Sequence, residues 1–337
     1  MNTRGRSAMS GICGCDCNRC NLKIYCQGCS LCDAAYCEKD CHRCFSICPE
    51  KGASFAHLNE IRVGQIELCE NDKYDLPCLI PVLPDRLTEK LFLPQNIIGI
   101  HGENFLSSNG ENVAKVYRTK GLKDAINLAN DDIQGVLQFY VKDRTLEGFW
   151  DNRKEIYRQM REFPFKAVIA PNFSVYEDAP RMDHLYNMRR SSIVYNELIE
   201  EGFPAVPDIS WFSKADLDRW IKEINENNVK TVAFSFQSVG TGSRASNAYV
   251  DNLIGFKYLT SHISKHVDII IAGMISVNRI EIIKANCENR FSVLNQSAYV
   301  YSRRGILSET GKSANFSLTK NQILLRNLEF YEKNYER

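Results

Sequence analysis

The sequence AVPDISWFSKADLDRWIKEINENNVKTVAFSF, residues 205–236, predicts the fold class because it holds a complete strand–helix–strand unit. Its two runs at Ala205–Trp211 and Thr231–Phe236 are largely apolar without strict alternation, which is typical of strands buried on both faces. Between them, Ser213 and Asp216 have the spacing of a helix capping box. A helix that joins two buried strands predicts that the strands lie parallel in one sheet.

The same unit repeats outward in both directions along the chain. Similar apolar runs occur at Leu79–Leu83, Ile97–His101, Gly135–Tyr140, Ala167–Phe173, Ile269–Met274 and Ser292–Gln296. Seven or eight runs separated by helical patterns predict an α/β fold of the (β/α)8 TIM-like barrel type, with an open α/β sheet as the alternative. No GxGxxG or GxxxxGK[ST] motif follows a run, so nothing in the sequence favours a dinucleotide or NTP fold.

Eleven of the fourteen cysteines lie near the N-terminus. They are Cys13, Cys15, Cys17, Cys20, Cys26, Cys29, Cys32, Cys37, Cys41, Cys44 and Cys48, and His42 lies among them. Cysteines two residues apart can chelate one ion, and a segment this poor in large apolar residues needs metal bonds to fold. We therefore expect a metal-binding module over residues 1–52 and a barrel domain over residues 53–337.

Two metals and one disulfide alternative fit this cysteine spacing. Twelve potential ligands are enough for up to three tetrahedral zinc sites. The segment Cys37–Pro49 also resembles a [4Fe-4S] ligand run that ends in Cys-Pro, with one spacer lengthened. That longer spacer, and the polar residues between the ligands, favour zinc by a narrow margin. A disulfide knot is less consistent with the chain, because no signal peptide precedes the cluster.

The composition is that of an ordinary globular protein, with 44% hydrophobic and 25% charged residues. The formal net charge of +1 gives no overall field that would attract nucleic acid, although a local basic groove is compatible with it. The apolar runs are too short to cross a bilayer. From these features we expect a cytoplasmic protein with no membrane contact and no obligate protein partner.

Polar side chains gather at the carboxyl ends of the predicted strands, where barrels carry their chemistry. Asp208 is the first catalytic candidate, because its apolar neighbours would desolvate it and tune its pKa. Glu103 is the second candidate and Asp178 the third. Helix capping or a loop position is the alternative role for each. Two such carboxylates could divide the work of glycosidic chemistry between them.

Further polar residues at the same ends are candidates for substrate binding. They are His101, Asn172, Tyr176, Trp211, Gln237, Asn295, Arg303 and Arg304, and Gln138, Tyr140 and Ser210 end the same runs. Gln237 and Asn172 would bind the edge of a base, and the two arginines would contact phosphates. A solvated basic loop is the alternative for the arginines.

Two resemblances connect these residues to known families. The blocks Pro171-x-Phe173-Ser174-x-Tyr176 and Pro207-x-x-x-Trp211 resemble an uncharacterised bacterial and phage domain family. More distantly, residues 272–274, 291–295 and 303–305 are similar to the closing strands of the tRNA-guanine transglycosylase superfamily, whose members are zinc-containing barrels that cut a base from its sugar. The cysteines of the present chain lie at the opposite end of the sequence from the zinc site of that superfamily.

The second resemblance implies chemistry at an N-glycosidic bond. We therefore expect an enzyme that cleaves or exchanges a base in nucleic acid, with DNA favoured over RNA. A bacterial defence glycosylase that acts on modified phage bases is one version of this hypothesis. A base in duplex DNA would have to be flipped out. The alternatives are a non-catalytic nucleic-acid adaptor and an iron–sulfur redox or radical enzyme.

Overall fold

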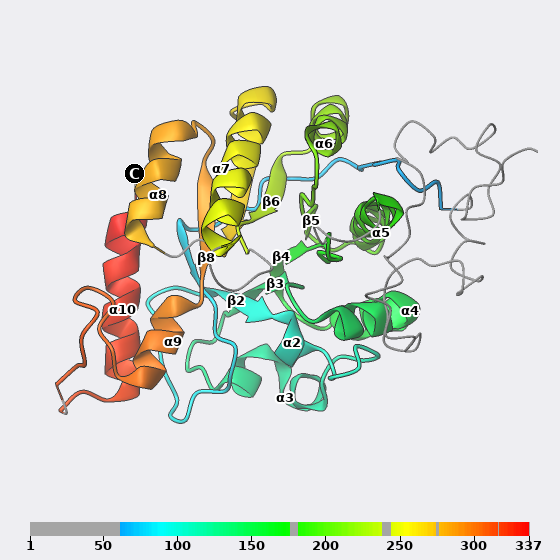
Figure 1. Ribbon diagram of the computed structural model, residues 1–337. Helices are drawn as coiled ribbons and strands as arrows, with labels where there is room; N and C mark the ends of the chain where they lie inside the picture. The colour runs from blue at the N-terminus through cyan, green and yellow to red at the C-terminus, as the bar shows by residue number, and fades with distance from the viewer. Residues whose placement is uncertain (1–60, 176–180, 238–243, 274–275, 316, 337) are drawn as a thin grey trace, which may run out of the picture.

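The computed structural model describes residues 61–175, 181–237, 244–273, 276–315 and 317–336 (Figure 1). Within these ranges the strands are β1 (Leu79–Pro81), β2 (Ile97–His101), β3 (Gln134–Gln138), β4 (Phe165–Ile169), β5 (Ala205–Val206), β6 (Thr231–Ser235), β7 (Asp268–Ala272) and β8 (Phe291–Asn295). Each predicted apolar run overlaps one of these strands. Strands β4 and β5 end well before their runs do, close to Pro171 and Pro207, which have no N–H to donate.

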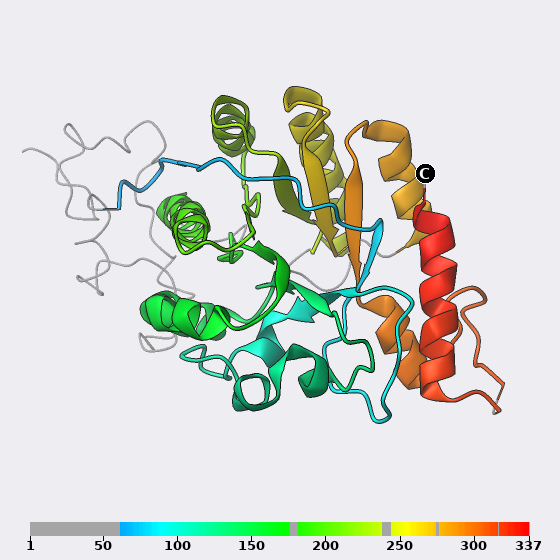
Figure 2. The same ribbon diagram turned by 180° about the vertical axis from the view of Figure 1, so that it is seen from behind.

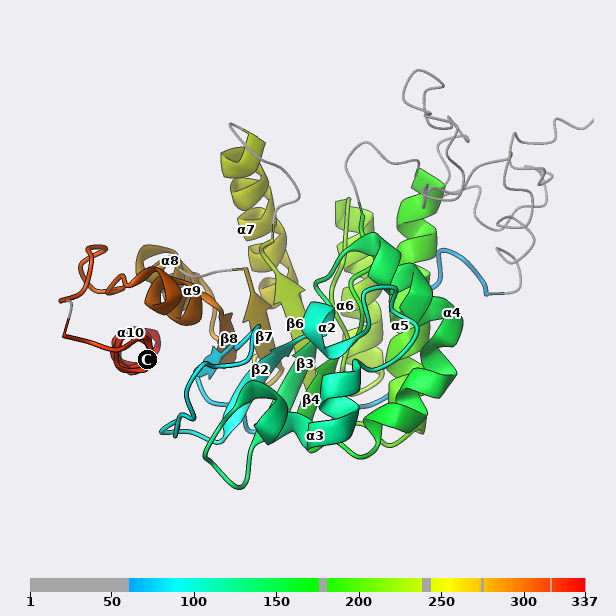
Figure 3. The same cartoon turned by 90° about the horizontal axis from the view of Figure 1, so that it is seen from below.

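Helices follow the strands from β2 onward. They are α2 (Gly102–Phe105), α3 (Lys115–Ile126), α4 (Asp143–Met160), α5 (Arg181–Glu200), α6 (Lys214–Glu226), α7 (Arg244–His262), α8 (Val277–Asn286), α9 (Ser297–Arg304) and α10 (Lys320–Tyr335). The predicted capping box is present at the start of α6, where Ser213 and Asp216 bond reciprocally. Figure 3 shows the helices on the outer sides of the strands. None of the helices in the described ranges is long and apolar enough to span a membrane.

All strand pairs are parallel, which confirms the predicted α/β fold with parallel sheets. The strands form two four-stranded sheets, in the orders β1-β8-β7-β6 and β2-β3-β4-β5. Isolated parallel bridges join the edges of the two sheets, from Val82 to Gly99 and from Asp208 to Ala233. Backbone hydrogen bonds accompany them, with Leu83 N donating to Gly99 O at 3.2 Å and Ile209 N to Ala233 O at 2.9 Å. Each edge of one sheet therefore meets an edge of the other.

The close approach of β1 and β2 depends on a glycine. A Cβ atom on Gly99 would lie 2.6 Å from Cγ2 of Val82 and 3.2 Å from Cδ2 of Leu294. Real Cβ contacts are longer than this, so any side chain at position 99 would push the two strands apart.

Apolar strand residues separate into two clusters, one on each face of the sheets. The larger cluster combines strand and helix residues. The smaller one, called the inner cluster below, contains Ile80, Val82, Val136, Ala167, Ile169, Val206, Ala233, Ile270, Ala272 and Leu294 with Leu76, and no helix residue belongs to it. The inner cluster therefore lies on the strand face that is turned away from the helices.

Buried asparagines fasten the amino ends of the strands. Asn71 lies in the segment before β1, which Figure 2 shows in blue as it crosses the molecule. Its Nδ2 donates to the carbonyls of Ala205 (3.2 Å) and Thr231 (2.8 Å), and its Oδ1 accepts from the N–H groups of Lys230 (2.7 Å) and Thr231 (3.0 Å). Asn71 thus satisfies four backbone groups where β5 and β6 begin.

Candidate active site at the carboxyl ends of the strands

The inner cluster continues into polar residues where the strands end. Side chains alternate between the faces of a strand, so every second residue after an inner-cluster residue points the same way. This alternation places six polar side chains on the inner face, and we call them the polar layer: His101, Gln138, Tyr140, Asp208, Ser210 and Ser235. They come from β2, β3, β5 and β6 or from the residues just beyond these strands.

Asp208 and Tyr140 form the closest contact in the polar layer. The Tyr140 hydroxyl donates to Asp208 Oδ1 at 2.6 Å, and Asp208 is 0% exposed. Burial raises the pKa of Asp208 to about 7, and the hydrogen bond from Tyr140 opposes part of this rise. Burial and the neighbouring Asp208 charge raise the pKa of Tyr140 well above its usual value, so the phenol stays protonated. The pair therefore holds a carboxyl group that can exchange a proton near neutral pH.

Two oxygen atoms at this end are buried without a hydrogen-bond partner in the described part of the chain. They are Asp208 Oδ2 and Ser210 Oγ. Both residues follow Val206 at even spacing, so both continue the inner face of β5. Buried polar atoms are nearly always paired in folded proteins, and an exception commonly marks a position for water, a ligand or catalysis.

His101 and Gln138 lie side by side in the polar layer. They are Cα partners in the parallel pairing of β2 with β3. The N–H of Glu103 donates to His101 Nδ1 at 3.3 Å, which makes His101 the cap of α2. Burial lowers the pKa of His101, although the charges of Glu103 and Asp85 oppose this shift. The imidazole is therefore neutral at pH 7.

Glu103, the second catalytic candidate, lies at the rim of this end. Lys142 Nζ is 2.6 Å from its Oε1, and the two side chains are 77% and 42% exposed, respectively. Both side chains of this ion pair are accessible to solvent. Glu103 therefore differs from Asp208 in both burial and charge partner, and its catalytic role stays a prediction.

The substrate-binding candidates differ in burial and in the residues that surround them. Asn295 is fully buried, and its amide donates to Tyr335 Oη (2.9 Å) and accepts from Ala298 N (3.0 Å), so it starts α9 and fixes α10. Trp211 packs outward on the larger cluster, with its ring against Gly255. Arg303 and Arg304 are exposed in the last turn of α9.

Two candidates are accessible near the polar layer. Asn172 is half-buried in the loop after β4, and Gln237 is exposed two residues beyond Ser235, whose Oγ accepts from Gln237 N at 3.1 Å. Asp178, Tyr176 and the cysteines from Cys13 to Cys48 lie outside the described residues. Among the residues that are described, no group of three or more His, Cys, Asp or Glu side chains could hold a metal ion.

The loop that carries Asn172 is tightly held by α4 and α5. Ser191 Oγ donates to Pro171 O at 2.7 Å, and Asn187 Nδ2 donates to Ser174 O at 2.6 Å. Arg190, which is 2% exposed, bonds Glu147 through two N–H groups (2.7 and 2.8 Å) and packs over Phe173. Asn172 therefore lies in a loop whose neighbouring residues Pro171, Phe173 and Ser174 each contact a side chain of α5.

Sequence reasoning missed the roles of three residues at this end. Tyr140 and Ser210 were visible as polar ends of strands, but only the three-dimensional structure reveals the Tyr140–Asp208 bond and the unpartnered Ser210 hydroxyl. Asp85 follows β1 and accepts from Asn104 Nδ2 and Tyr299 Oη, both at 3.4 Å. The signal for Asp85 was its position just after the Leu79–Leu83 run.

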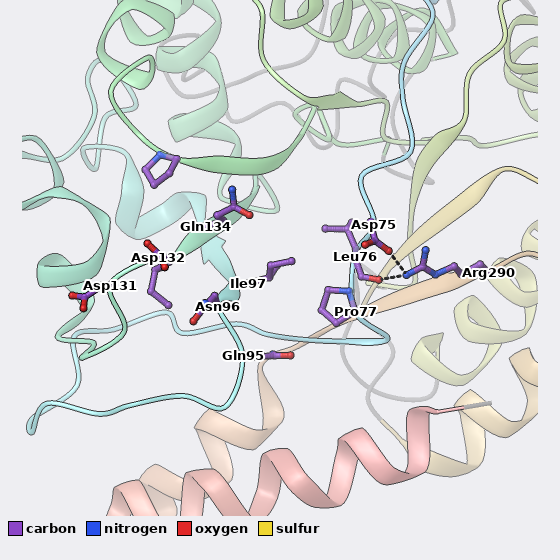
Figure 4. Close-up of a pocket in the computed structure, with 12 residues that line it drawn as sticks. Asp75, Leu76, Pro77, Gln95, Asn96, Ile97, Asp131, Asp132, Gln134 and Arg290 are labelled. Atoms are coloured by element: carbon purple, nitrogen blue, oxygen red, sulfur yellow. Dashed lines mark hydrogen bonds and ion pairs between the residues drawn. The ribbon is translucent and has the colours of Figure 1, made fainter.

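A large open cavity of about 810 Å³ lies at the opposite, amino ends of the strands (Figure 4). Of its charged groups, Asp75, Asp131 and Arg290 are paired, and Asp132 is exposed to solvent. Arg290 bonds Asp75 (3.1 Å) and the carbonyl of Leu76 (2.7 Å), and Asp131 pairs with Lys123 at 2.8 Å. Exposed and paired charges give this cavity no group prepared for chemistry.

A family model described as a domain of unknown function, DUF4417, matches residues 110–293, which contain both sequence blocks attributed above to an uncharacterised family. No curated protein matches the chain. Among solved structures, the YdjI aldolase from Escherichia coli K12 matches with 9% identity and a TM-score of 0.37, over 75% of this chain and 88% of that chain. A likeness at this level carries no argument about the reaction.

Proposed function

The chain belongs to the DUF4417 family of unknown function, and from this premise we propose that it is an enzyme that cleaves or exchanges the N-glycosidic bond of a nucleobase. The observation that carries the proposal is the buried Asp208 carboxyl, which is held by Tyr140 at 2.6 Å and keeps Oδ2 without a partner in the described part of the chain. The distant likeness to the transglycosylases supports the same bond as the target.

The scaffold in this proposal is one closed (β/α)8 barrel. The bridges from Val82 to Gly99 and from Asp208 to Ala233 support it, because they link the two sheets at both edges. An inner cluster with residues from β1 and from β3 to β8, and none from a helix, also fits the packed interior of a barrel. In such a barrel the polar layer would line the end where catalytic groups reside.

Asp208 would act as the proton acceptor in the hydrolytic form of the reaction. As the bond between the sugar carbon and the base nitrogen breaks, its electron pair goes to the base. A water oxygen bonds to the sugar carbon, and a water proton goes to Asp208 and from there to the released base. A carboxyl group with a pKa of about 7 suits both transfers at neutral pH. Glu103 would stabilise positive charge on the sugar.

The predicted roles of the cysteine module and of the substrate-binding candidates are retained in this proposal. The cysteine module would bind zinc, with a [4Fe-4S] cluster as the alternative, and would help to grip nucleic acid. Asn172 and Gln237 would contact the base and Arg303 and Arg304 the phosphates, since all four lie at or beyond the carboxyl ends of their strands. DNA is the favoured polymer, and a defence enzyme that acts on modified bases of phage DNA is one version of the proposal.

The test is incubation of the full chain with unmodified DNA, hypermodified phage DNA and RNA, followed by detection of abasic sites as alkali-labile breaks. We expect abasic sites with the wild type on at least one polymer. Asp208→Asn should reduce the rate at least 100-fold, because general acid–base catalysis contributes about that much or more. Asp132→Asn, an exposed carboxylate at the amino ends, is the matched control and should leave the rate unchanged. No abasic sites with the wild type, or equal rates for wild type and Asp208→Asn, would contradict the proposal.

A further inference from the structure

His101 has a defined protonation pattern within the polar layer. Its Nδ1 accepts the N–H of Glu103 at 3.3 Å, so the proton of the neutral ring is on Nε2. The capping bond also fixes the ring, since His101 must face the first turn of α2. Nε2 forms no hydrogen bond to any residue that the structure describes, so its N–H group is available to a ligand.

The charge state of His101 follows from its neighbours on each side. Burial favours the neutral ring and lowers its pKa, while Glu103 from α2 and Asp85 from the loop after β1 oppose this. Lys142, from the loop after β3, compensates Glu103 through the 2.6 Å contact. The ring can therefore donate a hydrogen bond from Nε2 without carrying a positive charge.

Gln138 lies beside His101 and offers a second polar side chain to the same ligand. It is the Cα partner of His101 across β2 and β3, and both side chains point to the inner face. Neighbouring strands lie about 4.8 Å apart, so side chains from these two positions can converge on adjacent polar groups of one planar heterocycle. Gln138 is 4% exposed, and its amide, which can donate and accept, makes no hydrogen bond to a described residue.

We propose that His101 and Gln138 together bind the hydrogen-bonding edge of the nucleobase, with His101 Nε2–H donating to a ring or carbonyl acceptor and Gln138 pairing with the adjacent group. This inference rests on the proposed function and identifies which residues hold the leaving base. His101 Nε2–H also donates to the base while the base receives the electron pair of the breaking bond. The hydrogen bond strengthens as negative charge develops, so His101 contributes to catalysis as well as to binding.

The test uses nitrogen-15 NMR of the full chain, in which six histidines give a small number of ring signals. We expect His101 to be a neutral Nε2–H tautomer at pH 7. Addition of free adenine, guanine, hypoxanthine, cytosine, uracil or thymine should shift the His101 Nε2 and Gln138 amide signals for at least one base. Free ribose and inorganic phosphate should not shift them. An Nδ1–H tautomer, or no shift with any base, overturns the inference.

Variants separate this inference from the proposed function. His101→Phe and Gln138→Met should each weaken base binding about tenfold, the effect of one lost hydrogen bond, and His101→Gln should weaken it less because its amide can still donate. His266→Gln, at an exposed histidine outside the polar layer, is the control and should bind as the wild type does. Abasic sites without base-induced shifts would refute the inference alone. Shifts without abasic sites would refute the proposed reaction alone.

Discussion

At the amino ends of the strands, the amide of Asn71 satisfies four backbone groups, whereas at the carboxyl ends Asp208 and Ser210 each bury an oxygen without a partner in the described part of the chain. Both ends bury polar side chains at similar depth, since Asn71 is 4% and Asp208 0% exposed. Buried polar groups that form hydrogen bonds stabilise a fold, and buried polar groups without a partner cost stability. The comparison indicates that Asn71 stabilises the amino ends, whereas Asp208 and Ser210 are kept at the carboxyl ends at a cost in stability.

The largest expected effect on stability comes from removing the Asn71 amide at the amino ends of the strands. Asn71→Ala would leave backbone groups of Ala205, Lys230 and Thr231 buried and unpaired, and we expect it to lower the free energy of unfolding by about 3 kcal/mol. Urea unfolding measures this change. Gln134→Ala, at an exposed residue at the start of β3, is the control and should change the value by less than about 0.5 kcal/mol. Equal effects of the two variants would show that the amino ends are not held by Asn71.

The second prediction concerns the pH dependence of stability at the carboxyl ends. The folded-state pKa of Asp208, about 7, lies above the ordinary aspartate value of 3.8 that applies in the unfolded chain, so ionisation costs stability as pH rises between these two values. We expect the contribution of Asp208 to unfolding free energy to fall by about 2.5 kcal/mol between about pH 5 and about pH 8. Comparison of wild type with Asp208→Asn isolates the contribution. Parallel pH profiles for the two proteins would contradict it.

Tyr140→Phe tests the carboxyl ends through a smaller expected change in stability. The Tyr140 hydroxyl lowers the pKa of Asp208, so its removal should raise that pKa further, by about one unit. Stability above about pH 8 should then fall by about 1.5 kcal/mol relative to the wild type, and the rise of abasic-site formation with pH should move upward by the same unit. Tyr258→Phe, which removes an exposed phenol bonded to Asp218, is a control that should leave the activity profile in place.

The smallest effect is expected at the rim. Glu103→Gln removes an exposed ion pair with Lys142 and should change the free energy of unfolding by less than about 0.5 kcal/mol. The same variant tests the predicted catalytic role of Glu103, which requires a loss of activity without loss of stability. A destabilisation above about 1 kcal/mol would show that the pair supports the fold.

The fold was more predictable than the site. The buried runs such as Ile97–His101 identify strands because Val and Ile on both faces exclude most other structures, and the capping box at Ser213 fixed the start of α6. The apolar neighbours of Asp208 indicated its burial correctly. Its bond to Tyr140 was not predictable, because it joins residues 68 positions apart through strand register. Asn295 was a substrate-binding candidate because it ends a predicted strand. The sequence did not show which face of β8 carries its side chain, and in the structure that side chain bonds Tyr335.

The pairing of β1 with β8 constrains the order in which the protein can fold during synthesis. Leu79, Ile80 and Pro81 are synthesised long before their parallel partners Val293, Leu294 and Asn295. The nascent chain must therefore keep β1 unpaired with β8 while the intervening strands and helices are produced, and contacts this distant in sequence form slowly. The two residues that follow β1, Val82 and Leu83, can meet Gly99 much sooner. That early contact gives the growing chain a short-range site at which to hold its first strand.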